Sequence, residues 1–275
     1  MTCDVLGPQA LDYMPCAYGA SRLRFRGPAR PTDGRFTAFM GGALTYGSFI
    51  ERPFPMCVEH GNGVVSVNLG QPTMGVDMLL RDPAIPQLAG AAAVTVIEVP
   101  GAINLSNNYY RVHPRRNDRF VQAAPVLRRL YPDVDFARFH FTQHLTQFLR
   151  RHDPERFELV AKSLQRAWQR RMSTLLDAVA GPAVLLWLGE GAPPARGGLS
   201  GSGMPPLVSA AMLDALTPAC AAQVQITYDA PDGQTDGKLF DATQERAAGR
   251  LPGPQVHEHI ARTLVPVIDD LMIRA

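Results

Sequence analysis

Short apolar segments punctuate the chain at intervals typical of strands. Each is mostly continuous rather than alternating, and most are rich in Val, Leu or Phe. Strands that are buried on both faces of a parallel sheet have this pattern. Several of the segments end in glycine, where a chain leaves a sheet. We predict five strands, at FTAFM (36–40), VVSVNLG (64–70), VTVIEVPG (94–101), AVLLWLG (183–189) and VQITY (223–227).

Helical patterns lie between these segments. Apolar residues recur at helical spacing in DFARFHFTQHLTQFLRRH (135–152) and in ERFELVAKSLQRAWQRRMSTLLDAV (155–179). Each of these two segments is interpreted as an amphipathic helix. In the last predicted helix, Pro254 lies near the first turn and Pro266 is expected to introduce a kink. The predicted helical regions are 43–60, 75–92, most of 120–180, and about 255–272.

Strands that alternate with helices predict an α/β fold, a three-layer and mainly parallel five-stranded sheet. We expect a polar, Arg-rich N-terminal lead-in (1–35) and a single α/β domain (36–275). Within that domain a helical insertion, about 105–180, separates the third and fourth strands. Ligands of such sheets bind beyond the carboxyl ends of the strands. The site is therefore expected to gather residues 41–47, 70–75, 101–107 and 189–192.

Charge and hydropathy narrow the classes of function. The net charge is only +2, too small to favour a nucleic-acid partner by bulk electrostatics. Of the 27 basic residues all but Lys162 and Lys238 are Arg, which reflects either base composition or a use of Arg forks for anionic groups. No apolar run reaches the length of a membrane span, and the start has no signal-peptide pattern. We expect a cytoplasmic protein with no membrane partner; the oligomeric state is left open.

The cysteines show no metal-binding spacing. Cys3, Cys16, Cys57 and Cys220 are far apart, and none forms a CxxC pair. With no export signal, they are expected to be reduced, mostly buried thiols. No cofactor is predicted.

Three motifs at the expected strand ends resemble the blocks of the SGNH/GDSL hydrolase superfamily. They are GGALTYG (41–47), NLGQPTMG (68–75) and VPGAIN (99–104). The resemblance implies a flavodoxin-like strand order with FTAFM between VVSVNLG and VTVIEVPG. It also implies backbone N–H groups and the Asn104 amide directed at an oxyanion. The ligand-binding candidates at these turns are Gly41, Gly42, Ala43, Thr45, Gly70, Gln71, Gly101 and Asn104.

The chain departs from that superfamily where its chemistry resides. Ala43 stands at the nucleophile position and Gly42 at the acidic position before it. In GRLPGPQVHEHIARTL (249–264), Leu251 falls where the catalytic base would be, and His257 matches a later position. Serine chemistry is therefore not expected.

Over its whole length the chain resembles a family of uncharacterised bacterial proteins for which no activity is established. The resemblance rests on DYMPCAYGASRLRFRGP, GGALTYGSFIERPFP, NLGQPTMGVD and VPGAINLSNNYYRVHPRRNDRF. It adds a family without adding a function.

Several polar residues have both a structural and a functional interpretation. Thr45 and Ser48 either serve the first turns of a helix or act as alternative nucleophiles. Asn104 either donates into the pocket or forms a turn. In HPRRNDR (113–119), Arg115 and Arg116 form either an anion site or a solvated loop paired with Asp118.

The histidines leave similar alternatives. His140 and His144 lie four apart in a predicted helix, a spacing able to bind zinc, but no third ligand accompanies them, so a metal is not expected. His257 either reaches the strand-end pocket or is a capping or surface histidine, and His259 lies close by.

Three functions remain open on the sequence alone. The first is an SGNH-like protein that has lost serine chemistry and binds a small polar or anionic ligand at the strand ends. The second is an active transferase or hydrolase whose rearranged site uses Asn104, His257 and Arg115 or Arg116. The third is a protein-interaction module acting through the helical insertion. We expect the first, with an anion at the glycine pair.

Overall fold

The computed structural model describes residues 10–196, 198 and 205–274. Its main sheet has five strands, all parallel, in the order β2-β1-β3-β6-β7. The predicted position of β1 between β2 and β3 is confirmed. The strands are β1 (Phe36–Met40), β2 (Val65–Asn68), β3 (Val94–Glu98), β6 (Ala183–Gly189) and β7 (Ala222–Thr227).

Burial explains why these segments lack an alternating pattern. Every residue of β1 and of β6 is buried, because helices cover both faces of the sheet. The edge strand β7 alternates instead, with Val224 and Ile226 buried and Gln225 exposed. The five apolar runs therefore predicted the strands well.

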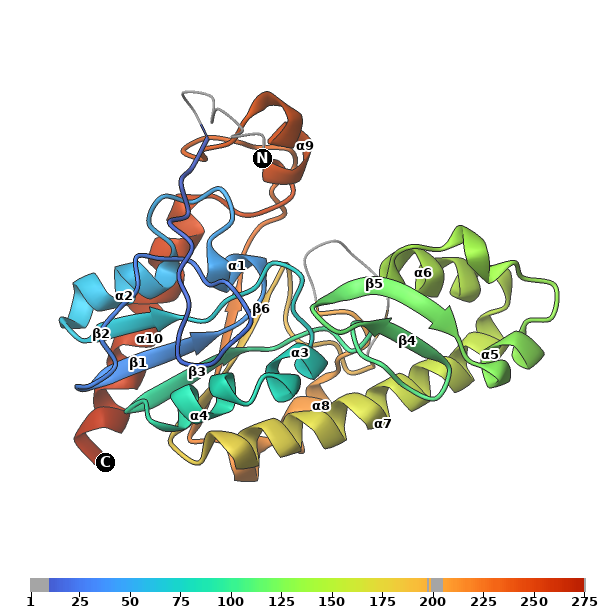
Figure 1. The fold of residues 1–275 in the computed structure, drawn as a ribbon, viewed down its shortest axis with the longest axis horizontal. Helices are drawn as coiled ribbons and strands as arrows, with labels where there is room; N and C mark the ends of the chain where they lie inside the picture. The colour runs from blue at the N-terminus through green and yellow to red at the C-terminus, as the bar shows by residue number, and fades with distance from the viewer. Residues whose placement is uncertain (1–9, 197, 199–204, 275) are drawn as a thin grey trace.

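Helices form a layer on each face of the sheet (Figure 1). One layer holds α2 (Phe54–Asn62) and α10 (Pro254–Arg274), which contains Pro266. The other holds α3 (Val76–Arg81), α4 (Ala84–Gly90) and the long α7 (Pro154–Val179). Shorter helices complete the chain: α1 (Ala43–Tyr46), α5 (Pro125–Leu130), α6 (Thr142–His152), α8 (Ala210–Asp214) and α9 (Glu245–Ala248).

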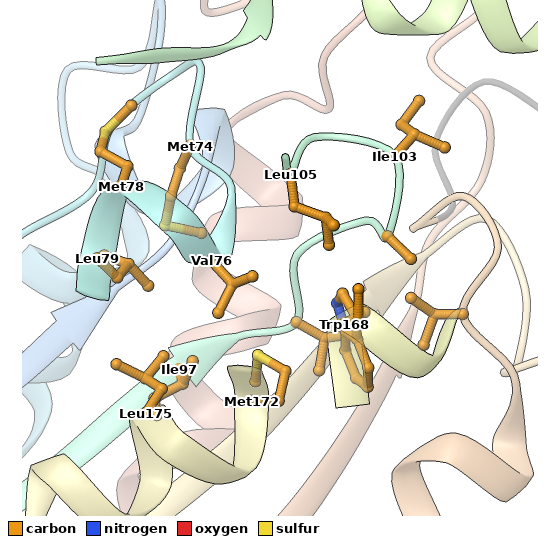
Figure 2. Close-up of a cluster of buried hydrophobic side chains, with 14 of the residues drawn as sticks. Met74, Val76, Met78, Leu79, Ile97, Ile103, Leu105, Trp168, Met172 and Leu175 are labelled. Carbon is orange, nitrogen blue, oxygen red and sulfur yellow. The ribbon is translucent and has the colours of Figure 1, made fainter. Parts of the chain in front are cut away.

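Helix α7 supplies much of the larger core. Figure 2 shows Met172 and Leu175 of this helix near Ile97 of β3 and Val76 of α3, and Trp168 near Leu105 of the loop after β3. Trp168 is fully buried, and its Nε1 donates to the carbonyl of Pro100 at 2.8 Å. This bond ties α7 to the loop that leaves β3.

The sequence predicted a helical insertion over about 105–180, but the first part of this insertion is not helical. Residues 110–123 form an antiparallel hairpin of β4 (Tyr110–His113) and β5 (Arg116–Ala123), with Pro114 and Arg115 at the turn. In β4 buried and exposed side chains alternate, with Tyr110 and Val112 buried and Arg111 exposed, which is a strand period rather than a helical one. In Figure 1 this hairpin, α5 and α6 lie beyond the carboxyl ends of the main strands, and α7 runs beneath both parts.

The predicted single helix over 135–152 is also wrong in its first turns. Helix α6 begins at Thr142, and His140 lies in an extended segment before it. The cause is pairing with the hairpin, because Phe120 N donates to His140 O at 3.0 Å and Arg119 bridges Phe141. His140 and His144 therefore do not share a helical face. His144 packs its ring against Phe139 instead.

The lead-in packs onto the domain. Tyr18, Leu23 and Phe25 are buried in the larger core. Arg26 is buried too, and its guanidinium donates to the carbonyls of Gly47 at 2.6 Å and Glu51 at 2.8 Å. Burial lowers the pKa of Arg26. Its hydrogen bonds to these carbonyls hold the turn after α1 in place.

Two general features concern the described part of the chain. Cys16, Cys57 and Cys220 are free thiols and half-buried, while Cys3 lies outside the described residues. Across residues 10–196, 198 and 205–274, no helix has the length and apolar character needed to cross a membrane.

Candidate functional site

The turns at the carboxyl ends of the strands lie against one another. Gln71 N donates to Gly41 O at 2.8 Å, which joins the turn after β2 to the turn after β1. A Cβ at Gly75 would overlap the carbonyl of Asn104, so the turns after β2 and β3 also touch. The structure thus brings together three of the four predicted segments: 41–47, 70–75 and 101–107.

Glu98, the last residue of β3, is directed into the turn after β1. Its Oε2 accepts hydrogen bonds from Gly42 N at 2.9 Å, Thr45 N at 3.1 Å and Thr45 Oγ1 at 2.5 Å. Gly42 is the N-cap of α1, so the carboxylate caps the start of this short helix from a neighbouring strand. An internal carboxylate therefore occupies the place where the sequence predicted an external anion.

The glycine pair makes this contact possible. A Cβ at Gly41 would overlap both Thr45 Oγ1 and the Glu98 carboxylate, and a Cβ at Gly42 would lie 3.2 Å from Glu98 Oε1. Only glycine at position 41 lets the carboxylate approach the backbone so closely. The opening Gly-Gly of the motif thus fits a turn built around Glu98.

Two further polar residues follow the neighbouring strands. Glu190 comes directly after β6, and Tyr228 comes directly after β7. Because parallel strands end at the same edge of the sheet, these side chains belong to one region with Glu98. Burial raises the pKa of Tyr228, and the nearby carboxylates of Glu98 and Glu190 raise it further.

Burial likewise raises the pKa of Glu98 itself. The hydrogen bonds from Thr45 and from Gly42 oppose that shift, since they favour the charged carboxylate. Glu98 is thus a carboxyl group whose proton is held more tightly than in water. Such a group suits either hydrogen bonding to a ligand or proton transfer.

A polar pocket of about 610 Å³ adjoins this edge at the end of β7. Tyr228, Asp229 and Asp236 contribute hydrogen-bond acceptors to its lining. Lys238 is also part of the lining, but its Nζ is already held by the carbonyls of Gln234, Ala248 and Leu251. The lining thus combines two carboxylates with an amine that backbone carbonyls already engage. Other residues of the lining are Gln234, Gln255 and His259.

The two alternative nucleophiles are buried in or beside α1. Thr45 is buried, and its hydroxyl already donates to Glu98. Ser48 is buried in the turn that ends α1, where its N–H donates to Ala43 O. Ala43 is half-buried on α1, and it has no side-chain group able to attack a substrate.

Asn104 is turned towards the insertion. Its Oδ1 accepts from Thr142 Oγ1 of α6 at 2.6 Å. The other three candidates at the turns also have structural contacts, and a Cβ at Gly70 would overlap the backbone of Tyr46. Gln71 Nε2 donates to Arg24 O of the lead-in at 2.6 Å, and Gly101 packs against Pro206.

The HPRRNDR arginines lie on the hairpin. Arg115 is exposed at the hairpin turn and lines a groove with Arg22 and Arg81. Arg116 is exposed at the start of β5, with its Nε 4.0 Å from Asp118. Neither Arg115 nor Arg116 has a recorded contact with the turn formed by Gly42 and Glu98.

His257 is a buried residue of α10 that packs against α2. Its Nδ1 accepts from Phe54 N at 3.1 Å, and its ring stacks on that of Phe54. Burial, helped by the charges of Arg26 and Lys238, lowers the pKa of His257 to about 3. The ring is therefore neutral and caps α2. Leu251, at the position of the missing base, packs against the core on the same face.

Glu98, Glu190 and Tyr228 were not singled out from the sequence. A usable signal existed for Glu98, because it is the one charged residue in the apolar run VTVIEVPG. Glu190 and Tyr228 each follow an apolar run directly, at the edge where α/β sheets bind ligands. The sequence could not predict that the Glu98 side chain is directed into the turn after β1.

Comparison with known proteins places the chain in a family. The model of a domain of unknown function (DUF6473) matches residues 1–272, and the chain belongs to this family. No curated protein matches. Among solved structures, a lipase from a goat rumen metagenome is similar over 84% of this chain and 96% of its own, with 12% identity and a TM-score of 0.41. That likeness is too distant to bear on activity.

Proposed function

We propose that the protein is an SGNH-like binding protein without serine chemistry, whose ligand sits at the carboxyl ends of the strands. The ligand is small and polar, donates hydrogen bonds and carries no negative charge. Polyols, sugars and small amines have this chemistry. The pocket beside Tyr228 receives the ligand, and Glu98 lies close to Tyr228 at the same strand ends.

The observation that carries the proposal is the Glu98 carboxylate on the glycine turn. The sequence favoured an anion because the N–H groups after Gly41 were expected to bind one. Glu98 accepts from Gly42 N and from Thr45 N, so those donors are already engaged. An anion could use these donors only by displacing the Glu98 carboxyl group from them.

The adjoining pocket supports the same ligand chemistry. Its lining includes the carboxylates of Asp229 and Asp236 and the hydroxyl of Tyr228. The amine of Lys238 donates to backbone carbonyls and adds little attraction for anions. A volume of about 610 Å³ lies within the range of small-molecule sites.

The raised pKa of Glu98 supports a second candidate function, an acid–base enzyme. In that case Glu98 would exchange a proton with a ligand hydroxyl or amine, and the pocket would hold the substrate. This candidate uses Glu98 rather than Asn104, His257, Arg115 and Arg116.

A thermal-shift screen tests the proposed ligand class. Neutral sugars, polyols and small amines should raise the melting temperature of the wild type, while their phosphorylated or carboxylated counterparts should not do so through this site. Tyr228→Phe removes one hydroxyl at the pocket and should weaken the response. Phe141→Leu, an exposed residue on the insertion, is the matched control and should leave it unchanged.

The proposal would be abandoned if neutral and amine ligands gave no shift in any variant. It would equally be abandoned if Tyr228→Phe kept the full response. A pH-dependent conversion of a responding ligand, lost in Glu98→Gln, would establish the acid–base candidate instead.

A further inference from the structure

A second pocket lies on the other side of the turn that follows β1. Its volume is about 630 Å³, and it is formed by the lead-in, helix α2 and the edge strand β2. Figure 1 shows these three segments together at the β2 edge of the sheet. The residues used below, all in its lining, are Arg26, Arg30, Arg52, Glu59 and Ser66.

The charge of this lining is positive. Three arginines, Arg26, Arg30 and Arg52, face one carboxylate, that of Glu59. Glu59 is fully engaged, since one oxygen pairs with Arg30 and the other accepts from Ser66 N at 2.9 Å. Arg52 is exposed and makes no ion pair within the described chain. The lining thus carries an excess of positive charge.

Two donors in the same lining are buried without a partner. Ser66 is 5% exposed, and its Oγ has no hydrogen-bond partner among the residues that the structure describes. Arg30 Nε is buried and lacks a partner in the same sense. Leaving such a group unsatisfied costs about 1–3 kcal/mol. Each of these donors would gain a partner if an oxygen-bearing ligand reached it from the pocket.

We propose that this pocket binds the oxyanion of a small molecule, a phosphate, sulfate or carboxylate group. Arg52 supplies a planar fork, Arg30 Nε a second charged donor, and Ser66 Oγ a neutral donor. Guanidinium groups suit such anions because their N–H groups match the spacing of the oxygens. This site is distinct from the Glu98 region and has the opposite charge preference.

Isothermal titration calorimetry with inorganic phosphate, sulfate and acetate, at an ionic strength held constant with chloride, tests the proposal. At least one of these ions should bind the wild type at a single saturable site. Ser66→Ala and Arg52→Gln should each weaken that binding by about tenfold or more, since each removes one donor. The preferred ion distinguishes a phosphate or sulfate group from a carboxylate.

Two variants control for structure and charge. Thr37→Val removes a fully buried hydroxyl that also has no partner in the described chain but does not line the pocket. Arg150→Gln removes an exposed arginine on α6. Both should bind the anion as the wild type does. Glu98→Gln should do so as well, which separates this site from the proposed function.

The melting temperature in the absence of ligand supplies a second readout. Ser66→Ala should not lower it, because the hydroxyl makes no hydrogen bond in the described chain. Absence of saturable oxyanion binding, or full binding retained by either Ser66→Ala or Arg52→Gln, would overturn the proposal. Because Arg52 is exposed, its variant tests the idea even if Ser66→Ala were to misfold.

Discussion

Glu98 shows how one side chain redirects a site. A glutamate at the end of a buried strand is unusual, because burial disfavours its charge. Here three hydrogen bonds from Gly42 and Thr45 compensate for part of that cost. The same side chain fills the anion position of the glycine turn, so the ligand preference expected from the motif no longer follows.

Replacing Glu98 with Gln should change how stability depends on pH. In the folded wild type the pKa of Glu98 is raised, so the folded state holds this proton more tightly than the unfolded state does. The stability that this group contributes is present below its unfolded pKa, about 4.3, and is lost as pH rises through the folded pKa. Relative to wild type, Glu98→Gln should therefore gain stability as pH rises from about 4. Urea unfolding at several pH values measures this. An unfolding free energy of Glu98→Gln that fell relative to wild type as pH rose would contradict the prediction.

His257 should show the opposite pH dependence. Its folded pKa is lowered to about 3, so its neutral form stabilises the fold above the unfolded pKa of about 6.5. That contribution is lost as pH falls towards about 3, by about 1.4 kcal/mol per pH unit. His257→Gln keeps an acceptor for Phe54 N but cannot titrate, so its stability should fall less steeply below pH 6.5. If the unfolding free energies of the two proteins changed equally with pH, His257 would not be a buried neutral cap.

At the level of elements, the sequence predicted the sheet better than the insertion. Continuous apolar runs such as AVLLWLG identify strands buried on both faces, and FTAFM lies where it was expected. The hairpin was missed because its alternation is broken by bulges around Val112 and interrupted by Pro114. The helix over 135–152 started late because Phe120 pairs with His140, a contact distant in sequence.

The candidate site was likewise predicted only in part from the sequence. The glycine turns at 41–42, 70 and 75 were recognisable because close backbone approach requires glycine. The partner of the first turn was not, because Glu98 comes from another strand and only the fold decides where it is directed.

Introducing a serine on α1 should not produce hydrolysis. Ala43→Ser places a hydroxyl where the sequence resemblance puts a nucleophile, but Leu251 stands where that resemblance puts the base. His257 is neutral, buried and bonded to Phe54 N. We expect neither wild type nor Ala43→Ser to hydrolyse 4-nitrophenyl butyrate above the rate of Ala43→Gly, the control. Ester turnover by Ala43→Ser that a fluorophosphonate abolishes would refute the absence of a base.

At the scale of the whole molecule, α7 links the insertion to the sheet. It runs from the insertion beneath the main strands (Figure 1), and Trp168 fastens it to the loop after β3. That loop continues towards Asn104, which bonds Thr142 of the insertion. The position of the insertion over the strand ends therefore depends on its contacts with the loop after β3.

Trp168→Phe should destabilise the whole protein. It deletes the bond to Pro100 O and leaves a cavity beneath Figure 2's cluster, at a combined cost of about 2 kcal/mol or more. Leu159→Ala, also on α7 but 51% exposed, is the control and should change stability by less than about 0.5 kcal/mol. Urea unfolding measures both, and equal effects would mean that α7 is not anchored as described.

A crystal structure grown after incubation with a metabolite extract tests the central claim most directly. We predict density for an uncharged or cationic polar molecule in the pocket beside Tyr228, within hydrogen-bond reach of a carboxylate at the strand ends. Density for an anion bonded to the Gly42 amide in place of Glu98, or a covalent adduct on Thr45 or Ser48, would contradict it.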